Sequence, residues 1–144
     1  MLVTETCADK VKGKQQLICP FGTIKYDASD VLCFDEGLYG YEEYSEFIVW
    51  NQQEYQPFQW LISLQNPDLM FPVVDPGNFV RDYQPSISEP ESWDTLLTIV
   101  SIGETRESVT ANLRAPILVQ RESQKAKQII LTDSKYPLRF QLIQ

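Results

Sequence analysis

The sequence predicts a small β-barrel-like domain that is mostly antiparallel and carries one or two short helical turns. Three observations lead to this fold class. The chain has 144 residues, its apolar residues fall in short runs about 8–12 residues apart, and nearly every run ends at a proline, glycine, aspartate or asparagine. Because this length suits one domain, we expect a single domain over residues 1–144, with 1–14 as a loose arm or an edge strand.

Six strands are expected in the first half of the chain. They are Leu17–Cys19, Gly22–Tyr26, Val31–Phe34, Phe47–Trp50, Phe58–Leu64 and Leu69–Val74. In Phe58–Leu64 four apolar side chains share one face and only Leu61 breaks the period of two, so we expect that face in the core. The expected core residues are Phe58, Trp60, Ile62, Leu64, Val100, Ile117, Ile129 and Leu131.

Four more strands are expected in the second half. They are Leu96–Ile102, Val109–Leu113, Ile117–Gln120 and Ile129–Thr132. The first of these is apolar on both faces, which is typical of a central buried strand. Pro116 cannot donate a ladder hydrogen bond, so a bulge, a bend or a sheet edge is expected there. The polar residues 121–125 suit the turn of a hairpin.

Helical signals are few. Ser88 followed by Glu91, with Pro90 near the first helical position, forms the pattern of a capping box. The segment leaves room for about two turns of helix before the next expected strand. One further helical turn is expected at Tyr41–Tyr44.

The charges are unevenly distributed along the chain. The formal net charge is −8, and no lysine or arginine occurs between Lys25 and Arg81. That stretch contains ten acidic residues, so it contributes −10, more than the whole net charge. An acidic surface of this kind repels nucleic acid and attracts basic partners. The other interpretation is a solvated surface that only keeps the protein in solution.

Residue usage excludes several classes of chemistry. The chain has no histidine, which removes the commonest general base and the commonest zinc ligand. Its three cysteines, Cys7, Cys19 and Cys33, have irregular spacing, so we expect reduced structural thiols. No apolar run is long enough for a membrane helix and the first residues lack a secretory signal, so a cytoplasmic setting is expected.

The acidic and aromatic residues do not indicate a catalytic or metal site. Adjacent acids such as Glu42 and Glu43 say nothing about the paired carboxylates of a glycosidase, which the fold must place. The Asp27–Asp30 segment lacks the glycine and the final glutamate of a calcium loop. We therefore expect no catalytic residue, metal or cofactor. Tyr39, Tyr41, Tyr44 and Tyr55 lie within the acidic stretch, where they either face a protein partner or lie on the barrel surface with their hydroxyls in water.

Several segments, read in order, resemble the bacterial flagellar assembly factor FliW family. The matching segments are Gly37–Glu42, Pro57–Leu64, Asn66–Leu69, Phe71–Pro76, Thr110–Ile117, Lys127–Leu131 and Tyr136–Arg139. The most specific is the run Asn-Leu-Arg-Ala-Pro-Ile at Asn112–Ile117. The sequence departs from the family at Tyr39, where proline is usual, at Tyr41, where phenylalanine is usual, and at Phe140, where histidine is expected.

The resemblance implies a non-catalytic cytoplasmic regulator of flagellum assembly with a small β-barrel-like fold. Proteins of this family bind flagellin and, as an alternative partner, CsrA, a dimeric RNA-binding repressor of flagellin translation. It further implies protein partners only, without direct contact to nucleic acid or membrane, and a monomer when free. CsrA must be basic to hold RNA, so the acidic stretch fits such a partner.

Seven residues are the candidates for partner binding. They are Tyr41, Glu42, Glu43, Tyr44, Tyr83, Asn112 and Arg114. Two other functions stay open from the residues alone. A deep pocket with converging acids would favour a small-ligand-binding or carboxylate-based enzyme on the barrel. A continuous basic face would favour an RNA-binding barrel, and it would have to join Arg106, Arg114, Arg121 and Lys125.

Overall fold

The computed structural model describes residues 14–85, 87, 93–105, 108–132 and 135–142. Strands dominate this part of the chain. They are β1 (Lys14–Cys19), β2 (Gly22–Asp27), β3 (Val31–Phe34), β4 (Glu46–Trp50), β5 (Gln59–Ser63), β6 (Met70–Val74), β7 (Thr95–Ser101), β8 (Thr110–Ala111), β9 (Ile117–Gln120), β10 (Lys125–Gln128) and β11 (Phe140–Gln141). The helical elements described are the 3-10 turns η2 (Ala28–Asp30), η3 (Gln53–Tyr55) and η4 (Pro76–Asn78).

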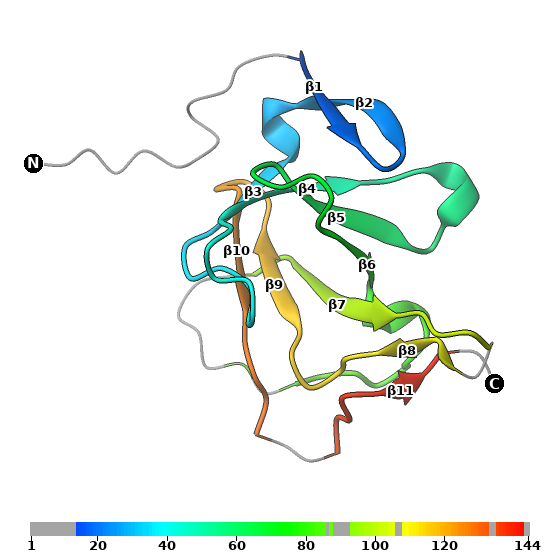
Figure 1. The fold of residues 1–144 in the computed structure, drawn as a ribbon. Coiled ribbons are helices and arrows are strands. Elements are labelled where there is room, and N and C mark those ends of the chain that lie inside the picture. Colours follow the sequence, from blue (N-terminus) through cyan, green and yellow to red (C-terminus); the bar gives the residue numbers. More distant parts are fainter. Residues whose placement is uncertain (1–13, 86, 88–92, 106–107, 133–134, 143–144) are drawn as a thin grey trace, which may run out of the picture.

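Strands β3 to β7, β9 and β10 form a closed barrel (Figure 1). The order around it is β7-β6-β5-β4-β3-β10-β9, and β9 pairs back onto β7. Every neighbouring pair is antiparallel except β10 with β3, which run parallel. The mostly antiparallel barrel expected from the sequence is thus confirmed, and its closure removes the unpaired sheet edges that invite aggregation.

Two small additions flank the barrel. Strands β1 and β2 form a separate hairpin sheet, which lies outside the barrel beside β4 and β5 (Figure 1). Strand β8 pairs with the end of β7, and β11 pairs with β8. The hairpin covers one outer face of the barrel, while β8 and β11 extend it at the end where β7 finishes (Figure 1).

The interior of the barrel is one apolar cluster. It includes Phe34, Phe47 and Leu61, none of which is exposed. The rings of Phe34 and Phe47 meet edge to face at 5.2 Å between centroids, a favoured aromatic geometry. A second cluster lies beneath the hairpin, where Leu17 and Ile24 pack with residues of β3, β4 and β5.

This arrangement corrects the face expected for strand β5. Ile62 is fully buried, but together with Trp60 and Leu64 it packs into the cluster beneath the hairpin, whereas Leu61 lies in the barrel interior. Phe58 is only half-buried, beside Phe79. Because the hairpin covers the outer face, both faces of β5 are largely buried, and the more apolar face is not the one that points into the barrel.

The last expected strand, Ile129–Thr132, was placed wrongly. Strand β10 is Lys125–Gln128, which pairs with β9 directly after a tight turn in which Gln124 takes a φ of 59°. Ala126 is the single apolar residue of this strand, so its hydrophobicity does not mark it as a strand. The chain after it stays beside the segment 114–116 through hydrogen bonds, such as Leu131 N to Arg114 O at 2.7 Å.

The remaining expectations have mixed outcomes. The expected strand Val109–Leu113 shrinks to Thr110–Ala111, because the chain bends at 113–115 just before Pro116. Val100, Ile117 and Leu131 are buried as expected, and Ile129 is half-buried.

Cys19 and Cys33 are both buried and no disulfide joins them. The expected N-terminal arm up to residue 13, Cys7 and the Ser88–Glu91 capping box lie outside the described residues. In the described ranges no helix has the length and apolar character to cross a membrane.

Candidate functional site

An open groove lies at the end of the barrel where β7 finishes. Its volume is about 400 Å³, and its walls come from the turn after β3, from β6 and β7, from the 112–115 bend and from the C-terminal segment. The lining residues are Tyr39, Tyr41, Phe71, Ile99, Ser101, Asn112, Arg114, Ala115, Gln128, Ile130, Leu138 and Arg139. Much of this lining is apolar or aromatic surface in contact with solvent, which is typical of protein interaction sites.

The turn after β3 carries the aromatic wall of the groove. Leu38 is buried at 1% exposure and anchors the turn, and Tyr41 N donates to Leu38 O at 2.8 Å. Gly37 adopts a φ of 68°, and a Cβ there would stand 2.5 Å from Glu42 Cα, so only glycine fits. The helical turn expected at Tyr41–Tyr44 is wrong, because no helix forms there. The chain forms successive β-turns with an isolated bridge between Leu38 and Tyr41.

Two tyrosines project from this turn. Tyr39 is 54% exposed and Tyr41 is 38% exposed. The Tyr41 ring rests edge-on against Phe71, with centroids 5.1 Å apart, so its orientation is fixed while its outer face stays in solvent. Rigid aromatic side chains held in this way lose little conformational entropy when a partner covers them.

The opposite wall is built by Asn112 and Arg114. The Asn112 side-chain oxygen accepts hydrogen bonds from the backbone N–H groups of Arg114 and Ala115, both at 3.1 Å, and so shapes the bend before Pro116. Arg114 Nε donates to Tyr136 O at 3.0 Å. This contact is with a backbone carbonyl. Its guanidinium is thereby held at the groove wall.

The side chain of Gln128 links the two walls of the groove through hydrogen bonds. Its side-chain oxygen accepts from Tyr39 N at 2.9 Å, and its side-chain nitrogen donates to Ala115 O at 3.1 Å. The residue is 8% exposed, so these bonds lie largely out of water. A single buried amide thus sets the distance between the tyrosine turn and the Arg114 bend.

The structure brings together three of the seven candidate residues. Tyr41, Asn112 and Arg114 line the groove. Glu42 and Glu43 are exposed on the adjoining turn. The Glu42 carboxylate accepts from Gly40 N at 3.1 Å, so it also stabilises that turn. Along the described chain, Glu43 has no hydrogen bond or ion pair.

The other two candidates have packing roles. Tyr44 packs against the barrel interior. Tyr83 stacks edge-on with Tyr136 at 4.8 Å and donates its hydroxyl hydrogen to Leu113 O at 2.5 Å. Burial, with a smaller contribution from Tyr136, raises the pKa of Tyr83 well above its usual value. Tyr83 therefore supports the bend before Pro116 and does not line the groove.

Nine of the twelve lining residues were not among the sequence candidates, and four of these nine are exposed hydrophobic or charged residues that a partner could contact. These four are Tyr39, Ile130, Leu138 and Arg139, and the first three are each more than half exposed. A signal was present for Ile130, because Ile129, Ile130 and Leu131 are consecutive apolar residues, and a strand with one face in the core and one in solvent cannot bury all three. For the C-terminal residues only the fold could show that the tail returns to the same end of the barrel.

The acidic stretch forms one side of the barrel. Its strands β3 to β6 are consecutive in the sheet order. Eight of its ten acidic residues are exposed, and the other two are half-buried. The groove lies where this side meets Arg114 and Arg139. A partner seated in the groove would therefore meet aromatic surface flanked by both signs of charge.

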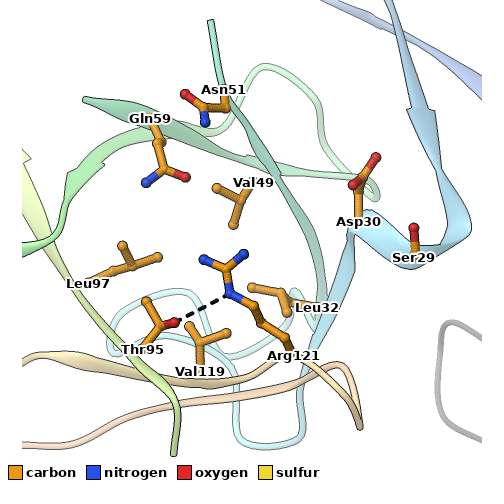
Figure 2. A pocket seen from close by; sticks show the side chains of 10 residues that line it. All are labelled: Ser29, Asp30, Leu32, Val49, Asn51, Gln59, Thr95, Leu97, Val119 and Arg121. Carbon is orange, nitrogen blue, oxygen red and sulfur yellow. Dashed lines mark hydrogen bonds between the residues drawn. The ribbon is translucent and has the colours of Figure 1, made fainter. Parts of the chain in front are cut away.

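A second hollow opens at the other end of β7. It is lined by Ser29, Asp30, Leu32, Val49, Asn51, Gln59, Thr95, Leu97, Val119 and Arg121, and its volume is about 270 Å³ (Figure 2). It contains one carboxylate, that of Asp30, so it lacks the converging acids that a carboxylate-based enzyme requires. Over the described ranges, no cluster of acidic and cysteine side chains could hold a metal ion.

The basic residues do not form the face that an RNA-binding barrel requires. Arg114 lies in the groove, whereas Arg121 lies in the second hollow, at the opposite end of β7. Lys125 is exposed at the start of β10, and Arg106 is outside the described residues. The cations that the structure places are therefore divided between the two ends of the barrel.

Comparisons with known proteins agree with one another. The sequence model of the family described as FliW protein matches residues 19–142. The flagellar assembly factor FliW of Caldanaerobacter subterraneus subsp. tengcongensis is 40% identical over 134 residues, which cover 86% of this chain and 89% of the relative. That of Leptospira biflexa serovar Patoc is 36% identical over 135 residues, covering 87% and 88% of the two chains.

Comparison with solved structures gives the same result as the sequence comparisons. The crystal structure of the flagellar assembly factor FliW superposes with a TM-score of 0.79 at 26% sequence identity. The match covers 90% of this chain and 98% of that one. The closed barrel and its additions are therefore a shared architecture.

Proposed function

This chain belongs to the FliW family of flagellar assembly factors, regulatory proteins rather than enzymes, and from that premise we propose that it binds CsrA and flagellin as alternative partners. Free protein would bind CsrA and relieve repression of flagellin translation. Accumulated flagellin would occupy the protein and leave CsrA free to repress. We further propose that it acts in the cytoplasm, where both partners are made, and that it is a monomer when free.

The observation that carries the proposal is the groove with its acidic flank. Exposed tyrosines and apolar side chains provide surface that a protein partner can bury. The exposed carboxylates of the acidic side would speed the approach of a basic protein such as CsrA. The same negative field would disfavour RNA on a complex of the two proteins.

The first experiment tests the exchange of partners. Purified CsrA and flagellin from the same bacterium are each titrated into the protein by calorimetry, and CsrA is then titrated into a preformed complex with flagellin. Each partner should bind at micromolar concentration or tighter, and flagellin should abolish or strongly weaken CsrA binding. If neither partner binds at micromolar concentration, the proposal fails. If a stable ternary complex forms, exchange of partners is wrong.

The second experiment tests the acidic flank. Reversing the charges in Glu42→Lys with Glu43→Lys should slow association with CsrA, because charges at an interface rim mainly set the association rate. The effect should shrink as salt rises to physiological strength, where the Debye length is about 8 Å. The control, Glu54→Lys with Asp68→Lys, makes the same change in net charge at exposed positions outside the groove lining. Equal rates for both double variants at low salt would remove the turn from the interface.

The third experiment tests the aromatic wall. Tyr39→Ala and Tyr41→Ala should each speed dissociation of a partner and leave the association rate nearly unchanged, because buried aromatic contacts act after encounter. Tyr55→Ala is the matched control, since Tyr55 is exposed but lies beside Phe21 and Trp60, outside the groove. Dissociation rates that match the unsubstituted protein for both groove variants would place the interface elsewhere.

A further inference from the structure

The second hollow has the layout of a small-ligand site. Its floor is apolar and is formed by Leu32, Val49, Leu97 and Val119, which come from four different strands. Polar side chains occur around the opening, with Asn51 and Gln59 on one side and Thr95 and Arg121 on the other (Figure 2). An apolar base with a few polar groups at its rim is the usual composition of ligand pockets, and the mouth of a β-barrel is a common position for one.

Arg121 is oriented by bonds to Asp94 and to Thr95 at the cavity rim. Its backbone N–H donates to Asp94 Oδ2 at 2.8 Å, and its Nε donates to Thr95 Oγ1 at 3.3 Å. Thr95 in turn donates to Asp94 Oδ1 at 2.9 Å. The two terminal nitrogens of the guanidinium point over the apolar floor (Figure 2). They make no hydrogen bond with the described residues and remain available to a ligand.

The acids near the opening leave this cation available. The ion pair of Asp94 with Arg121 joins Asp94 Oδ1 and Arg121 Nε at 3.7 Å. Asp30, across the opening, uses Oδ2 to accept from Asp27 N at 2.8 Å, within the cap of η2. A guanidinium that keeps both terminal nitrogens free matches the two oxygens of a carboxylate.

The cavity volume limits the size of the ligand. One molecule takes up about 30 Å³ in liquid water, so we count about 30 Å³ for each non-hydrogen atom of a ligand. A cavity of about 270 Å³ then holds about nine non-hydrogen atoms. We propose that the mouth of the barrel binds a small amphipathic anion, a carboxylate whose head group meets Arg121 and whose apolar chain or ring of about that size lies on the floor. This site is separate from the partner-binding groove, so the proposal does not depend on the function proposed above.

The groove at the other end does not have these properties. Its lining is largely exposed, whereas Leu97 and Val119 on the cavity floor are each 3% exposed. The Arg121 side chain is 71% exposed, so it can bind a charged head group at the cavity opening. The buried floor can bind the apolar part of the ligand. A ligand that needs both features should therefore prefer the cavity.

The test uses octanoate, which has ten non-hydrogen atoms, and the isotope-labelled full chain. Titration followed by two-dimensional ¹H–¹⁵N NMR should give shifts concentrated at the cavity residues, with a Kd below about 1 mM. Acetate, which has the head group alone, and octylammonium, which has the opposite charge, should cause no comparable shifts. If octylammonium binds equally well, or if the shifts concentrate at Tyr39, Ile130 and Leu138, the proposal is wrong.

Two variants separate the head-group contact from the floor. Arg121→Gln should weaken octanoate binding about fivefold to tenfold, because a charge-assisted pair is lost. The control Arg81→Gln removes an equal charge at an exposed position outside the cavity and should leave the affinity unchanged. Val49→Phe should fill the half-buried floor position and abolish binding while the spectrum of the rest of the barrel is kept. Unchanged affinity in both Arg121→Gln and Val49→Phe would overturn the site.

Discussion

The two ends of strand β7 carry hollows of opposite construction. At one end, Ile99 and Ser101 adjoin a groove whose walls are mostly turns, bends and the C-terminal segment. At the other, Thr95 and Leu97 adjoin a smaller cavity whose floor consists of side chains within strands. The shape of the groove thus depends on a few specific hydrogen bonds between loops, whereas the shape of the cavity floor depends on the strands of the barrel.

This difference bears on what each end can bind. A wide groove with exposed aromatic walls offers surface to another protein but encloses no small molecule. A narrow cavity with a buried floor can enclose about nine non-hydrogen atoms but offers little area to a protein. The comparison also predicts how substitutions divide. Changes in the loop bonds of the groove should cost stability and partner binding together, whereas changes at the cavity rim should alter ligand binding alone.

The largest effect is expected from Gly37→Ala. The new Cβ would lie 2.5 Å from Glu42 Cα and 2.8 Å from Glu42 O, in a backbone with a φ of 68°. The turn must therefore distort, which should lower the free energy of unfolding by about 2–4 kcal/mol and abolish partner binding. Gly40→Ala is the control, since its φ is 90° but no atom lies within 4 Å of the added Cβ. It should cost about 1 kcal/mol.

Urea unfolding of both glycine variants measures this difference. Octanoate binding by Gly37→Ala should persist under conditions where the barrel is folded, because the cavity has no residue from this turn. If Gly37→Ala and Gly40→Ala unfold at the same urea concentration, the tight approach of Gly37 to Glu42 does not limit the turn.

The next effect is expected from Gln128→Leu. The substitution keeps the approximate volume but leaves Tyr39 N and Ala115 O without their partner. A loss of about 1–3 kcal/mol in unfolding free energy is expected, together with weaker partner binding, because the two groove walls lose their link. Gln53→Leu, at an exposed position, is the control and should change stability by less than about 0.5 kcal/mol. Unaltered stability in Gln128→Leu would show that water replaces both bonds.

A smaller and pH-dependent effect is expected from Tyr83→Phe. The loss of the bond to Leu113 O should cost about 1 kcal/mol at neutral pH. Since the pKa of Tyr83 is raised in the folded state, the unfolded chain releases this proton first as pH rises above the ordinary value of 10.0. The contribution of Tyr83 to the free energy of unfolding should therefore be constant below about pH 10. Above that pH it should fall by at most about 1.4 kcal/mol per pH unit.

The substituted protein should lose part of this alkaline slope. Unfolding free energies measured between neutral pH and pH 11 in both proteins would show it. Some slope should remain, because burial, with a smaller contribution from Glu46, also raises the pKa of Tyr26. If Tyr83→Phe leaves the alkaline slope unchanged, the Tyr83 hydroxyl is not the group that titrates.

The smallest effect on stability is expected at the cavity rim. Arg121→Gln removes an exposed ion pair with Asp94, so the free energy of unfolding should change by less than about 0.5 kcal/mol. CsrA and flagellin affinities should also be unchanged, since Arg121 lies outside the groove. Thermal unfolding and calorimetry measure the two quantities. A large loss of stability would mean that the contacts of Arg121 with Asp94 and Thr95 are stronger than those of an exposed pair, and a large loss of partner affinity would mean that the two ends of the barrel are coupled.

Much of the fold was predictable because its signals are local. Turn residues and short apolar runs placed β3 and β9 at their observed bounds and most other strands within a residue or two. The failures came where an element's neighbours decide its environment. Strand β10 is polar and was displaced to the apolar residues after it, and the inward face of β5 was assigned without knowledge of the hairpin that covers its outer face.

The groove was predictable only in part. Tyr41, Asn112 and Arg114 were named from the sequence and do line it, but Tyr44 and Tyr83 pack elsewhere. Both kinds of tyrosine stand among polar residues in the sequence, so their neighbours along the chain do not distinguish them. Leu138 and Arg139 were missed because they follow the last strand that the sequence indicated.

By itself, the sequence determined the barrel class, the positions of most strands, the acidic side and the membership of the FliW family. These follow from residue order, since periodicity, turn chemistry and charge counts are properties of short or contiguous segments. The tertiary structure alone decided the closure of β9 onto β7, the link through Gln128 and the separation of Arg114 from Arg121. Each of these depends on contacts between residues far apart in the chain, and only the folded arrangement of all the strands specifies such contacts.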